Sequence, residues 1–372
     1  MPDQMRPRAE VVVDLDAVRH NVALLAARAP GAATMAVVKA DGYGHGALPV
    51  ARAALEAGAT WLGSCSLAEA LDLRNGGVTA RIMSWLDVPE TDLTTGVEAD
   101  IDLSASSIRE LAAITDAATR TGKQARVHLK IDTGLSRNGC QPRDWQDLVD
   151  SAAKAQSDGL VEVVGVWSHL ACADEPGHPA TDRQAARFAT AYDIALAAGL
   201  HPLRHIANSA ATLNRPDLHF DLVRVGIAMY GLNPLPSKEN LRPAMTFRSS
   251  VALTKRIDDG ESVSYGHTWT TTKDTNLALV PVGYADGISR ALSNRMDVWL
   301  AGKRRPVVGR VCMDQIVVDC GDDVVNPGDE VILFGDGTRG EPTATEWANL
   351  LDTIDYEIVT GMYRPRVVRS YR

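Results

Sequence analysis

A lysine that could form a covalent bond to a carbonyl group stands near the N-terminal end of the chain. Lys39 follows an apolar run that begins at Thr34, and it precedes a glycine-rich turn that ends at Gly46. Desolvation disfavours the ammonium form, so an amine in such a place can titrate near neutrality and attack a carbonyl. The run predicts Schiff-base chemistry; the alternative is a lysine whose stem lies along the strand with its charge in solvent.

Further motifs with polar or charged side chains follow one another over most of the chain. They are Lys130 to Arg137, Trp167 to Leu170, Ala207 to Ser209, Arg224 to Ile227, Ser264 to Trp269, Gly309 to Asp314 and Arg364 to Arg366. Together with the Lys39 run, this series resembles the alanine racemase family, whose members are fold-type III enzymes that use pyridoxal 5'-phosphate. The resemblance implies an isomerase that interconverts L- and D-alanine by two-base proton transfer. In a bacterium its product would serve peptidoglycan synthesis.

The resemblance also implies how the cofactor is held. Lys39 would form the Schiff base, and backbone N–H groups and hydroxyls from loops late in the barrel would bind the phosphate. The residues implied in cofactor binding are Lys39, Tyr43, Asn208, Ser209, Arg224, Gly226, Ile227 and Tyr356. From the residues alone, Ser209 could equally be a helix N-cap, Gly226 a turn glycine and Tyr43 a tyrosine packed on a loop.

Arg224 bears most directly on the type of reaction. The family places an arginine beside the pyridine nitrogen of the cofactor, and a guanidinium does not readily give up its proton. The ring nitrogen then stays unprotonated and the ring withdraws electrons weakly, which favours reprotonation at Cα over transamination. The alternative for Arg224 is a structural ion pair with Asp221.

A racemase needs an acid/base group on each face of the substrate Cα. The resemblance assigns these roles to Lys39 and to Tyr265, which lies in the run Ser264 to His267. A phenol has a reference pKa of about 10, so nearby positive charge must lower it before the phenolate can act as an efficient base. The family pattern implies that His169 provides this effect by bridging Tyr265 and Arg224.

Substrate recognition is implied at further positions. The resemblance gives the substrate carboxylate to Arg137 and to the backbone N–H of Met313, with Asp314 beside them and Tyr284 lining the access route. A guanidinium suits a carboxylate because it can donate two parallel hydrogen bonds, although Arg137 could instead lie on a solvated loop. Lys130 matches a position that is carbamylated in some members; either that modification or a chloride ion would relieve its repulsion of Arg137.

The composition of the chain favours small molecules as its ligands. The 372 residues carry a formal net charge of −9, and the sequence pI is near 5.5, which argues against nucleic acid and anionic membranes. The five cysteines are scattered without a Cys-x-x-Cys pair, which fits a reducing compartment and predicts neither disulfides nor a metal site. The polar start of the chain and the lack of a long apolar run predict no signal peptide and no membrane span, and hence a cytoplasmic protein.

The elements that must position these residues alternate between strand and helix. Apolar β-rich runs are separated by Ala- and Leu-rich segments of helical period, such as Ala47 to Ala57, Ser106 to Thr121 and Thr181 to Ala198. The predicted strands are Thr34 to Lys39, Trp61 to Cys65, Ala80 to Trp85, Ile101 to Ser104, Ala125 to Ile131, Val161 to Ser168, Leu203 to Ala207 and Leu222 to Val225. Eight such units predict an α/β fold with an N-terminal (β/α)8 TIM barrel. Its strand ends would bring six polar residues to one rim: Lys39, Lys130, His169, Asn208, Ser209 and Arg224.

A second, mostly-β domain is predicted after a proline-containing linker, Asn233 to Asn240. We therefore place the barrel, with an extra leading strand and helix over Glu10 to Ala29, in residues 1–240 and the C-terminal β-domain in residues 241–372. Its predicted strands are Phe247 to Ile257, Leu277 to Val282, Asp297 to Leu300, Arg305 to Val311, Gln315 to Val318 and Glu330 to Phe334, with one late helix, Thr345 to Leu351. In this family Tyr265 and Lys39 meet across a subunit interface, so the resemblance implies a homodimer whose sites are shared.

Three alternative functions remain at this point. A racemase of broader specificity, or one for serine or lysine, would share the catalytic set and differ in pocket size. A decarboxylase of the same architecture would release carbon dioxide and would need no base at Tyr265. A non-catalytic protein that binds pyridoxal phosphate with the barrel alone would not need the β-domain that carries Tyr265.

Overall fold

The computed structural model describes residues 7–237 and 239–372, which form two compact units. The barrel unit comprises Val18–Gly42 and Ala47–Leu241; the C-terminal unit comprises the described residues up to Ala17, Tyr43–Gly46 and Arg242–Arg372. The first six residues, on which the expectation of no signal peptide partly rests, lie outside the described part, as does residue 238 in the predicted linker. None of the helices in the described part is long and apolar enough to cross a membrane.

The barrel unit contains eight parallel strands, as predicted. Their spatial order is β8-β7-β6-β5-β4-β3-β2-β9. The bounds are β2 Ala33–Val37, β3 Trp61–Ser64, β4 Arg81–Ser84, β5 Ile101–Ala105, β6 Ala125–Lys130, β7 Val161–Trp167, β8 Leu203–His205 and β9 Leu222–Val225. Backbone hydrogen bonds join the two outer strand segments: the N–H of Asp221 donates to Arg204 O (3.2 Å) and the N–H of Arg224 donates to Ala207 O (3.0 Å). These bonds close the sheet, and the predicted (β/α)8 barrel is confirmed.

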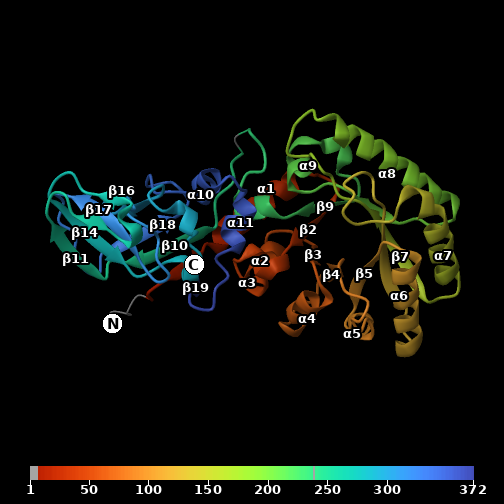
Figure 1. The fold of residues 1–372 in the computed structure, drawn as a ribbon. Coiled ribbons are helices and arrows are strands. Elements are labelled where there is room, and N and C mark those ends of the chain that lie inside the picture. The colour runs from red at the N-terminus through yellow and green to blue at the C-terminus, as the bar shows by residue number, and fades with distance from the viewer. Residues whose placement is uncertain (1–6, 238) are drawn as a thin grey trace. The chain divides into compact units, whose positions relative to one another are not determined.

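Helices cover the outside of the barrel strands. Figure 1 shows α6 and α7 along the outer face of β5 to β7, and α8 beyond them. The helices are α1 Leu15–Arg28, α2 Lys39–Tyr43, α3 Ala47–Glu56, α4 Leu67–Asn75, α5 Thr94–Glu98, α6 Ile108–Thr121, α7 Trp145–Ser157, α8 Pro179–Ala197 and α9 Ser209–Asn214. Parallel strands are buried on both faces, so strands such as β2, β3 and β7 are largely apolar, and these runs made them recognisable in the sequence.

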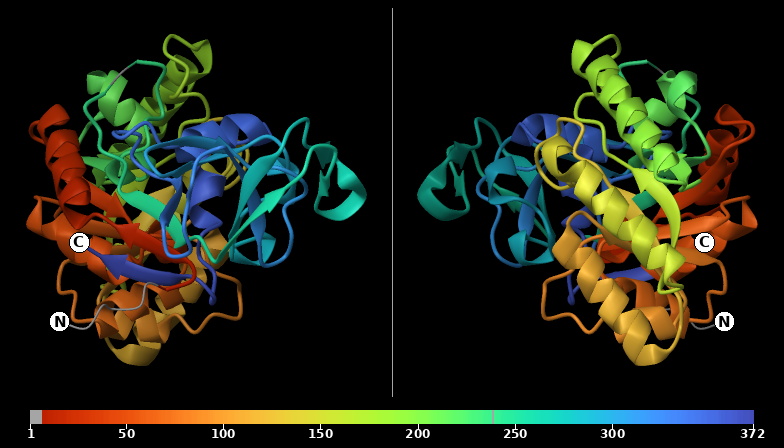
Figure 2. Two further views of the ribbon diagram at one scale, coloured as in Figure 1. Left: turned by 90° about the vertical axis from the view of Figure 1, so that its left-hand side faces the viewer. Right: turned by 90° about the vertical axis from the view of Figure 1, so that its right-hand side faces the viewer.

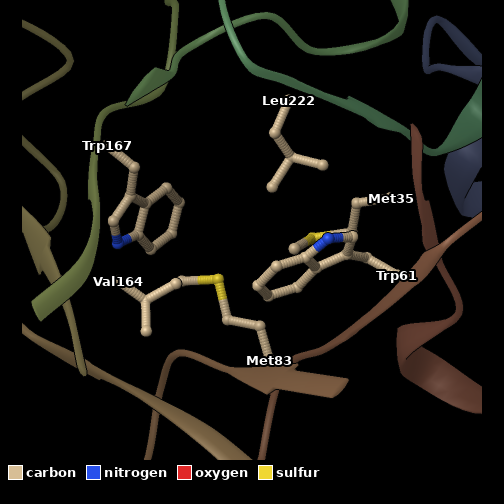
Figure 3. Close-up of a cluster of buried hydrophobic side chains, with 6 residues drawn as sticks. All are labelled: Met35, Trp61, Met83, Val164, Trp167 and Leu222. Carbon is tan, nitrogen blue, oxygen red and sulfur yellow. The ribbon is translucent and has the colours of Figure 1, made fainter. Parts of the chain in front are cut away.

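The barrel interior is filled by side chains from strands on opposite sides. Figure 3 shows a cluster in which tryptophans and methionines converge: Met35, Trp61, Met83, Val164, Trp167 and Leu222. Replacing one of these tryptophans by alanine would cost about 3–5 kcal/mol, because the surrounding barrel cannot collapse into the space. This apolar layer makes the barrel a rigid support for the polar groups around it.

The C-terminal unit is built around a six-stranded mixed sheet of order β16-β15-β18-β10-β1-β19 and a three-stranded sheet of order β11-β14-β17. Its strands are β1 Glu10–Val13, β10 Met245–Ser250, β11 Leu253–Ile257, β12 Ser262–Val263, β13 Trp269–Thr270, β14 Thr275–Val280, β15 Asp297–Leu300, β16 Lys303–Pro306, β17 Ile316–Gly321, β18 Glu330–Phe334 and β19 Val368–Tyr371. Two helices, α10 Ala344–Leu351 and α11 Asp355–Thr360, follow β18.

Several expectations for the C-terminal half need correction. The strand predicted over Arg305 to Val311 ends at Pro306, since β16 spans Lys303–Pro306. The strand predicted over Phe247 to Ile257 is two strands, because β10 pairs with β18 whereas β11 pairs with β14 in another sheet. The single predicted late helix is followed by a second one, α11, which is too short to show helical periodicity. The leading strand β1 pairs with β10 and β19 and so belongs to the C-terminal unit; Figure 2 shows it (red) beside β19 (blue).

Candidate active site

The segment that carries Lys39 has an unusual backbone. The strand β2 ends at Val37, two residues earlier than predicted, and Lys39 opens the short helical segment α2. Ala40, Asp41 and Gly42 have φ values of 52°, 51° and 62°, so this turn is left-handed, a conformation that costs energy for residues with a side chain. The Glu69 carboxylate helps to hold the turn by accepting a hydrogen bond from the Ala40 N–H at 2.7 Å. Lys39 thus lies at the start of a strained turn that the Glu69 carboxylate helps to hold in place.

Arg224 lies at the centre of the barrel site and is 5% exposed. Its terminal nitrogens donate to the backbone carbonyls of Ser168 (2.7 Å) and His205 (2.9 Å). Among the residues that the structure describes, no carboxylate pairs with it, and burial lowers the pKa of Arg224 to about 9. The alternative of an Arg224–Asp221 ion pair is wrong, because Asp221 pairs with Arg204 at 2.9 Å.

His169 is held beside this guanidinium. Its Nδ1 lies 3.3 Å from Nη2 of Arg224, and because a guanidinium only donates, the imidazole nitrogen must accept. Burial and the charges of Arg224, Arg137, Lys130 and Lys39 hold the pKa of His169 well below its usual value. The ring is therefore neutral, with its proton on Nε2, and the positive charge of the pair resides on Arg224.

Lys130 ends β6 and is also buried, with 5% of its surface exposed. Its Nζ lies 4.1 Å from the centroid of the Trp167 ring, which also faces Arg224. Burial, together with the charges of Arg224 and Arg137, lowers the pKa of Lys130 to about 7. Arg137 itself is exposed on the loop after β6, and no described residue forms an ion pair with it.

The loops after β8 and β9 are tied together by one hydroxyl. Ser209 Oγ accepts hydrogen bonds from the backbone N–H groups of Gly226 (2.8 Å) and Ala228 (3.3 Å). The N-cap of α9 is not Ser209 but Asn208, whose side chain accepts from the Ala211 N–H at 3.0 Å. Both residues are thus bonded within the barrel unit, in the loops that also carry Gly226 and the buried Ile227.

The site residues of the C-terminal unit lie on exposed loops. Tyr265 begins a 3-10 turn, Tyr265–His267, and is 72% exposed, while Met313 is 52% exposed. The preceding Ser264 has φ 65°, and its hydroxyl donates to Arg310 O at 2.8 Å, which holds the turn beside the Met313 loop. The tyrosine ring is presented by a fixed backbone with little side-chain packing around it.

Tyr284 and Met313 are neighbours within this unit. The N–H of Tyr284 donates to Cys312 O and the N–H of Ala285 donates to Met313 O, both at 3.0 Å. Gly283 permits this close approach, because a Cβ there would lie 2.5 Å from Met313 O. Asp314 pairs with Arg366 at 2.6 Å.

Tyr43 and Tyr356 also lie together in the C-terminal unit. Tyr43 is buried, and its ring centroid is 6.0 Å from that of Tyr356, which lies on α11 and is 37% exposed. The aromatic neighbour of Tyr43 therefore comes from a helix of the C-terminal unit. The Nδ1 of His45 adds a 2.9 Å contact to the carbonyl oxygen of Tyr43.

Comparison with known proteins decides the family. Residues 13–234 match the model of the alanine racemase N-terminal domain, and residues 244–371 match that of the C-terminal domain. The chain is 57% identical over 366 residues to the alanine racemase of Salinispora arenicola, with 98% of each chain covered. The chain belongs to the alanine racemase family.

Solved structures of other alanine racemases agree with the fold. The crystal structure of alanine racemase from D-cycloserine-producing Streptomyces lavendulae is 52% identical, with a TM-score of 0.96 over 99% of this chain and 98% of that one. The Bacillus anthracis alanine racemase with bound L-Ala-P is 36% identical, with a TM-score of 0.89 over 99% and 96% of the two chains. The protein is thus an isomerase, an alanine racemase that depends on pyridoxal phosphate.

The barrel unit has a charge distribution that fits this cofactor. The pKa of His169 is lowered by the positive charges of four residues: Lys39, Lys130, Arg137 and Arg224. Of these, the buried Lys130 and Arg224 form no ion pair with a described carboxylate. Such an excess of buried positive charge is costly unless an anion compensates it. A racemase supplies two, the phosphate of the cofactor and the carboxylate of the amino acid.

The structure also brings residues to the barrel interior that the sequence analysis did not select. His128, His205 and Asp102 are fully buried and hydrogen-bonded to one another behind Arg224. A signal was present, because Arg126, His128 and Lys130 occupy alternate positions of one predicted strand, and such residues point to the same face. Polar residues repeated on the inward face of a barrel strand predict a buried polar network.

Proposed function

We propose that this racemase moves the Cα proton of alanine with two catalytic residues, Lys39 and Tyr265, which come from different subunits of a homodimer. Pyridoxal phosphate, when joined to an amine through its aldehyde, withdraws electrons from the Cα–H bond and so makes this proton removable. Lys39 would hold the cofactor and exchange the proton on one face, and Tyr265 would exchange it on the other. The exposed ring of Tyr265 supports a role at a site completed by a second chain.

The observation that carries this proposal is the buried guanidinium of Arg224, which has no carboxylate partner among the described residues. A donor of this kind suits an unprotonated ring nitrogen, which can only accept. His169, neutral and bonded to Arg224, would pass the influence of that charge to Tyr265 and favour its phenolate form. Arg224 and His169 therefore act on the reaction through their hydrogen bonds.

The remaining residues would bind the cofactor and the substrate. For the phosphate and ring of the cofactor we propose Tyr43, Asn208, Ser209, Gly226, Ile227 and Tyr356. For the substrate we propose Arg137 and the backbone N–H of Met313 as carboxylate donors, with Asp314 and Tyr284 restricting access to small side chains. The bonding of the Ser209 hydroxyl to the Gly226 N–H supports a shared phosphate loop.

Lys130 is proposed as a carbamylated residue. A pKa of about 7 leaves much of its amine neutral near neutral pH, and only a neutral amine can react with carbon dioxide. The carbamate would replace a buried positive charge by a negative one, which would attract Arg137 in place of repelling it.

The division of labour follows the two parts of the chain. We propose that residues 1–240 bind the cofactor with the help of Tyr356, and that the rest of residues 241–372 contributes to the site of the partner subunit. The product would supply peptidoglycan synthesis in the cytoplasm. All five cysteines are free, which fits a reducing compartment.

Mixing two inactive variants tests both the catalytic pair and the shared site. Lys39→Ala and Tyr265→Phe would each be nearly inactive as homodimers. If each site takes its lysine from one chain and its tyrosine from the other, mixed dimers regain one intact site of two, or about a quarter of full activity after random reassortment. The assay is D-alanine formation from L-alanine after dissociation and reassociation of the mixture. No recovery, with mixed dimers demonstrated by a tag on one variant, would exclude the shared site.

A panel of L-amino acids tests the substrate range. Alanine should give the highest kcat/KM, and bulky or basic side chains should give rates lower by orders of magnitude. Release of carbon dioxide from any of them would support the decarboxylase alternative, which no observation on this structure favours.

A further inference from the structure

A chain of hydrogen bonds crosses the barrel interior behind Arg224. It begins at Asp102 on β5, whose Oδ2 lies 3.1 Å from His128 Nε2 on β6. His128 Nδ1 lies 2.9 Å from His205 Nε2 on β8, and His205 Nδ1 lies 3.3 Å from Nη1 of Arg224 on β9. The Asp102 and both histidine side chains are inaccessible to solvent.

Only one assignment of donors and acceptors along this chain of hydrogen bonds satisfies every contact. The guanidinium of Arg224 has no acceptor, so Nδ1 of His205 accepts and its single proton is on Nε2. His205 then donates to Nδ1 of His128, whose own proton is consequently on Nε2 and is donated to Asp102. Burial, His128 and Arg224 hold the pKa of His205 well below its usual value, which keeps a second proton off this ring.

The far end of the chain is anchored by two arginines. Asp102 accepts hydrogen bonds from Nη2 of Arg81 and Nε of Arg126, each at 2.6 Å. Burial acts to raise the pKa of Asp102, but the hydrogen bond from His128 and the charges of Arg126 and Arg81 outweigh it and lower this pKa. Asp102 is therefore an ionised acceptor that the barrel holds in place.

The surrounding barrel is shaped to hold the two rings against each other. Gly165 on β7 leaves the necessary space, since a Cβ at this position would collide with Nδ1 of His128 and lie 3.0 Å from Nε2 of His205. Trp167 stacks on His205 with an interplanar angle of 3°, and the edge of Trp61 meets His128 at 89°. Neither imidazole can turn without displacing a tryptophan.

The chain of hydrogen bonds also determines which N–H group of Arg224 remains to bind a ligand. Nη1 donates to the backbone oxygen and to Nδ1 of His205. Nη2 donates to the backbone oxygen of Ser168 and to Nδ1 of His169. No described residue accepts from Nε–H, so the guanidinium is held in place while this donor remains for a ligand.

We propose that Asp102, His128 and His205 are positioning residues that relay the negative charge of Asp102 to Arg224 and so keep the guanidinium charged and oriented in the racemase site. The inference rests on the proposed role of Arg224 toward the cofactor ring. No proton moves along the chain; each neutral imidazole is polarised by the next group, and the polarisation accumulates toward Arg224.

The first test measures the tautomers directly and does not depend on racemisation. In the holoenzyme labelled with 15N-histidine, long-range 1H–15N correlation spectra should show His128 and His205 as Nε2–H tautomers. The signals are assigned with His128→Asn and His205→Asn. An Nδ1–H tautomer or a doubly protonated ring at either position would overturn the proposal, even in a fully active enzyme.

The second test separates a positioning role from a merely structural one. Gly165→Ala forces the rings apart, whereas Gly63→Ala on β3 is a matched control, because its Cβ would meet Trp85 and Met35 and no member of the chain. Gly165→Ala should lower kcat by ~10-fold or more with little change in KM, and should shift the visible absorption of the bound cofactor. Equal kcat and equal spectra for the two variants would overturn the proposal.

A third variant keeps the proposal testable if Gly165→Ala does not fold. His128→Asn retains an amide oxygen near the position of Nδ1 but loses the donor to Asp102. His219→Asn is its control, since His219 is a buried histidine outside the chain that bonds to Thr212 O at 2.9 Å. A lower kcat and an altered cofactor spectrum only in His128→Asn support the relay, and identical behaviour of the two variants contradicts it. Inactivity of the unmodified protein would instead reject the proposed function and leave the tautomer result standing.

Discussion

The two units of the chain present their site residues in opposite ways. In the barrel unit Arg224 and Lys130 are almost fully buried, and Arg224 is clamped by carbonyls and imidazoles of several strands. In the C-terminal unit Tyr265, Met313 and Tyr284 lie on loops and are 72%, 52% and 41% exposed. The candidate residues of the barrel unit are thus fixed by the fold of that unit, whereas those of the C-terminal unit leave their side chains exposed.

The physical reason lies in the kind of group each half holds. Buried cations are costly, so the barrel holds both terminal nitrogens of Arg224 with carbonyl and imidazole acceptors before a ligand binds. Exposure of a phenol to solvent costs little free energy, so Tyr265 can be held in place by its backbone alone. The hydrogen bond from the Ser264 hydroxyl to Arg310 O holds this backbone. Variants in the two halves should therefore fail for different reasons.

The largest effect is expected from Lys39→Ala. Loss of the amine removes both the covalent attachment of the cofactor and one base, so racemisation should fall by more than about 10⁴-fold. Borohydride treatment followed by peptide mapping should label Lys39 in the unmodified enzyme and nothing in the variant. Lys154→Ala, an exposed lysine on α7, is the control and should keep full activity. Retention of label elsewhere would show that another lysine holds the cofactor.

Tyr265→Phe should lower the rate by ~10³-fold, because one of the two proton transfers loses its acid/base group. The cofactor spectrum and the melting temperature should not change, since the hydroxyl lies on an exposed ring. Tyr363→Phe, another exposed tyrosine of the same unit, should behave like the unmodified enzyme. Near-normal rates in both directions would reject Tyr265 as a base.

In protein kept free of carbon dioxide, so that Lys130 carries no carbamate, the stability of the barrel half should depend on pH through this amine. Its pKa is lowered from 10.5 to about 7, so between these values the folded protein binds fewer protons than the unfolded chain and becomes more stable as pH rises. Lys130→Met lacks this contribution. The stability difference between the two proteins, from urea unfolding at about pH 7 and about pH 10, should change by on the order of 3 kcal/mol in favour of lysine at the higher pH. A constant difference would mean that Lys130 is not a titrating amine.

The smallest effect is expected from Arg366→Gln in the C-terminal half. The Asp314–Arg366 pair is short at 2.6 Å, but both side chains are about half exposed, so its loss should cost less than about 1 kcal/mol of stability. If Asp314 helps to orient the Met313 loop, KM for alanine should rise roughly two- to threefold with kcat unchanged. A large fall in kcat would instead indicate that this loop is as tightly organised as the barrel site.

The comparison also explains which features the sequence could predict. Several barrel strands were recognisable because strands buried on both faces are largely apolar. The strand over Phe247 to Ile257 was predicted as one element because its residues carry no mark of the two different sheets that receive β10 and β11. The partner of β1 lies more than 200 residues away, at β10, and no local pattern indicates such a pairing.

By itself the sequence determined the alternation of strands and helices, the family and the identity of the candidate site residues, because these depend on residue type and order. Only the tertiary structure decided that Asp221 pairs with Arg204 and that Lys130 and Arg224 are buried without an ion pair to a described carboxylate. It also decided that Asp102, His128 and His205 form one chain of hydrogen bonds. The reason is that burial and hydrogen-bond direction are properties of neighbours in space, and in a barrel those neighbours come from strands far apart in sequence.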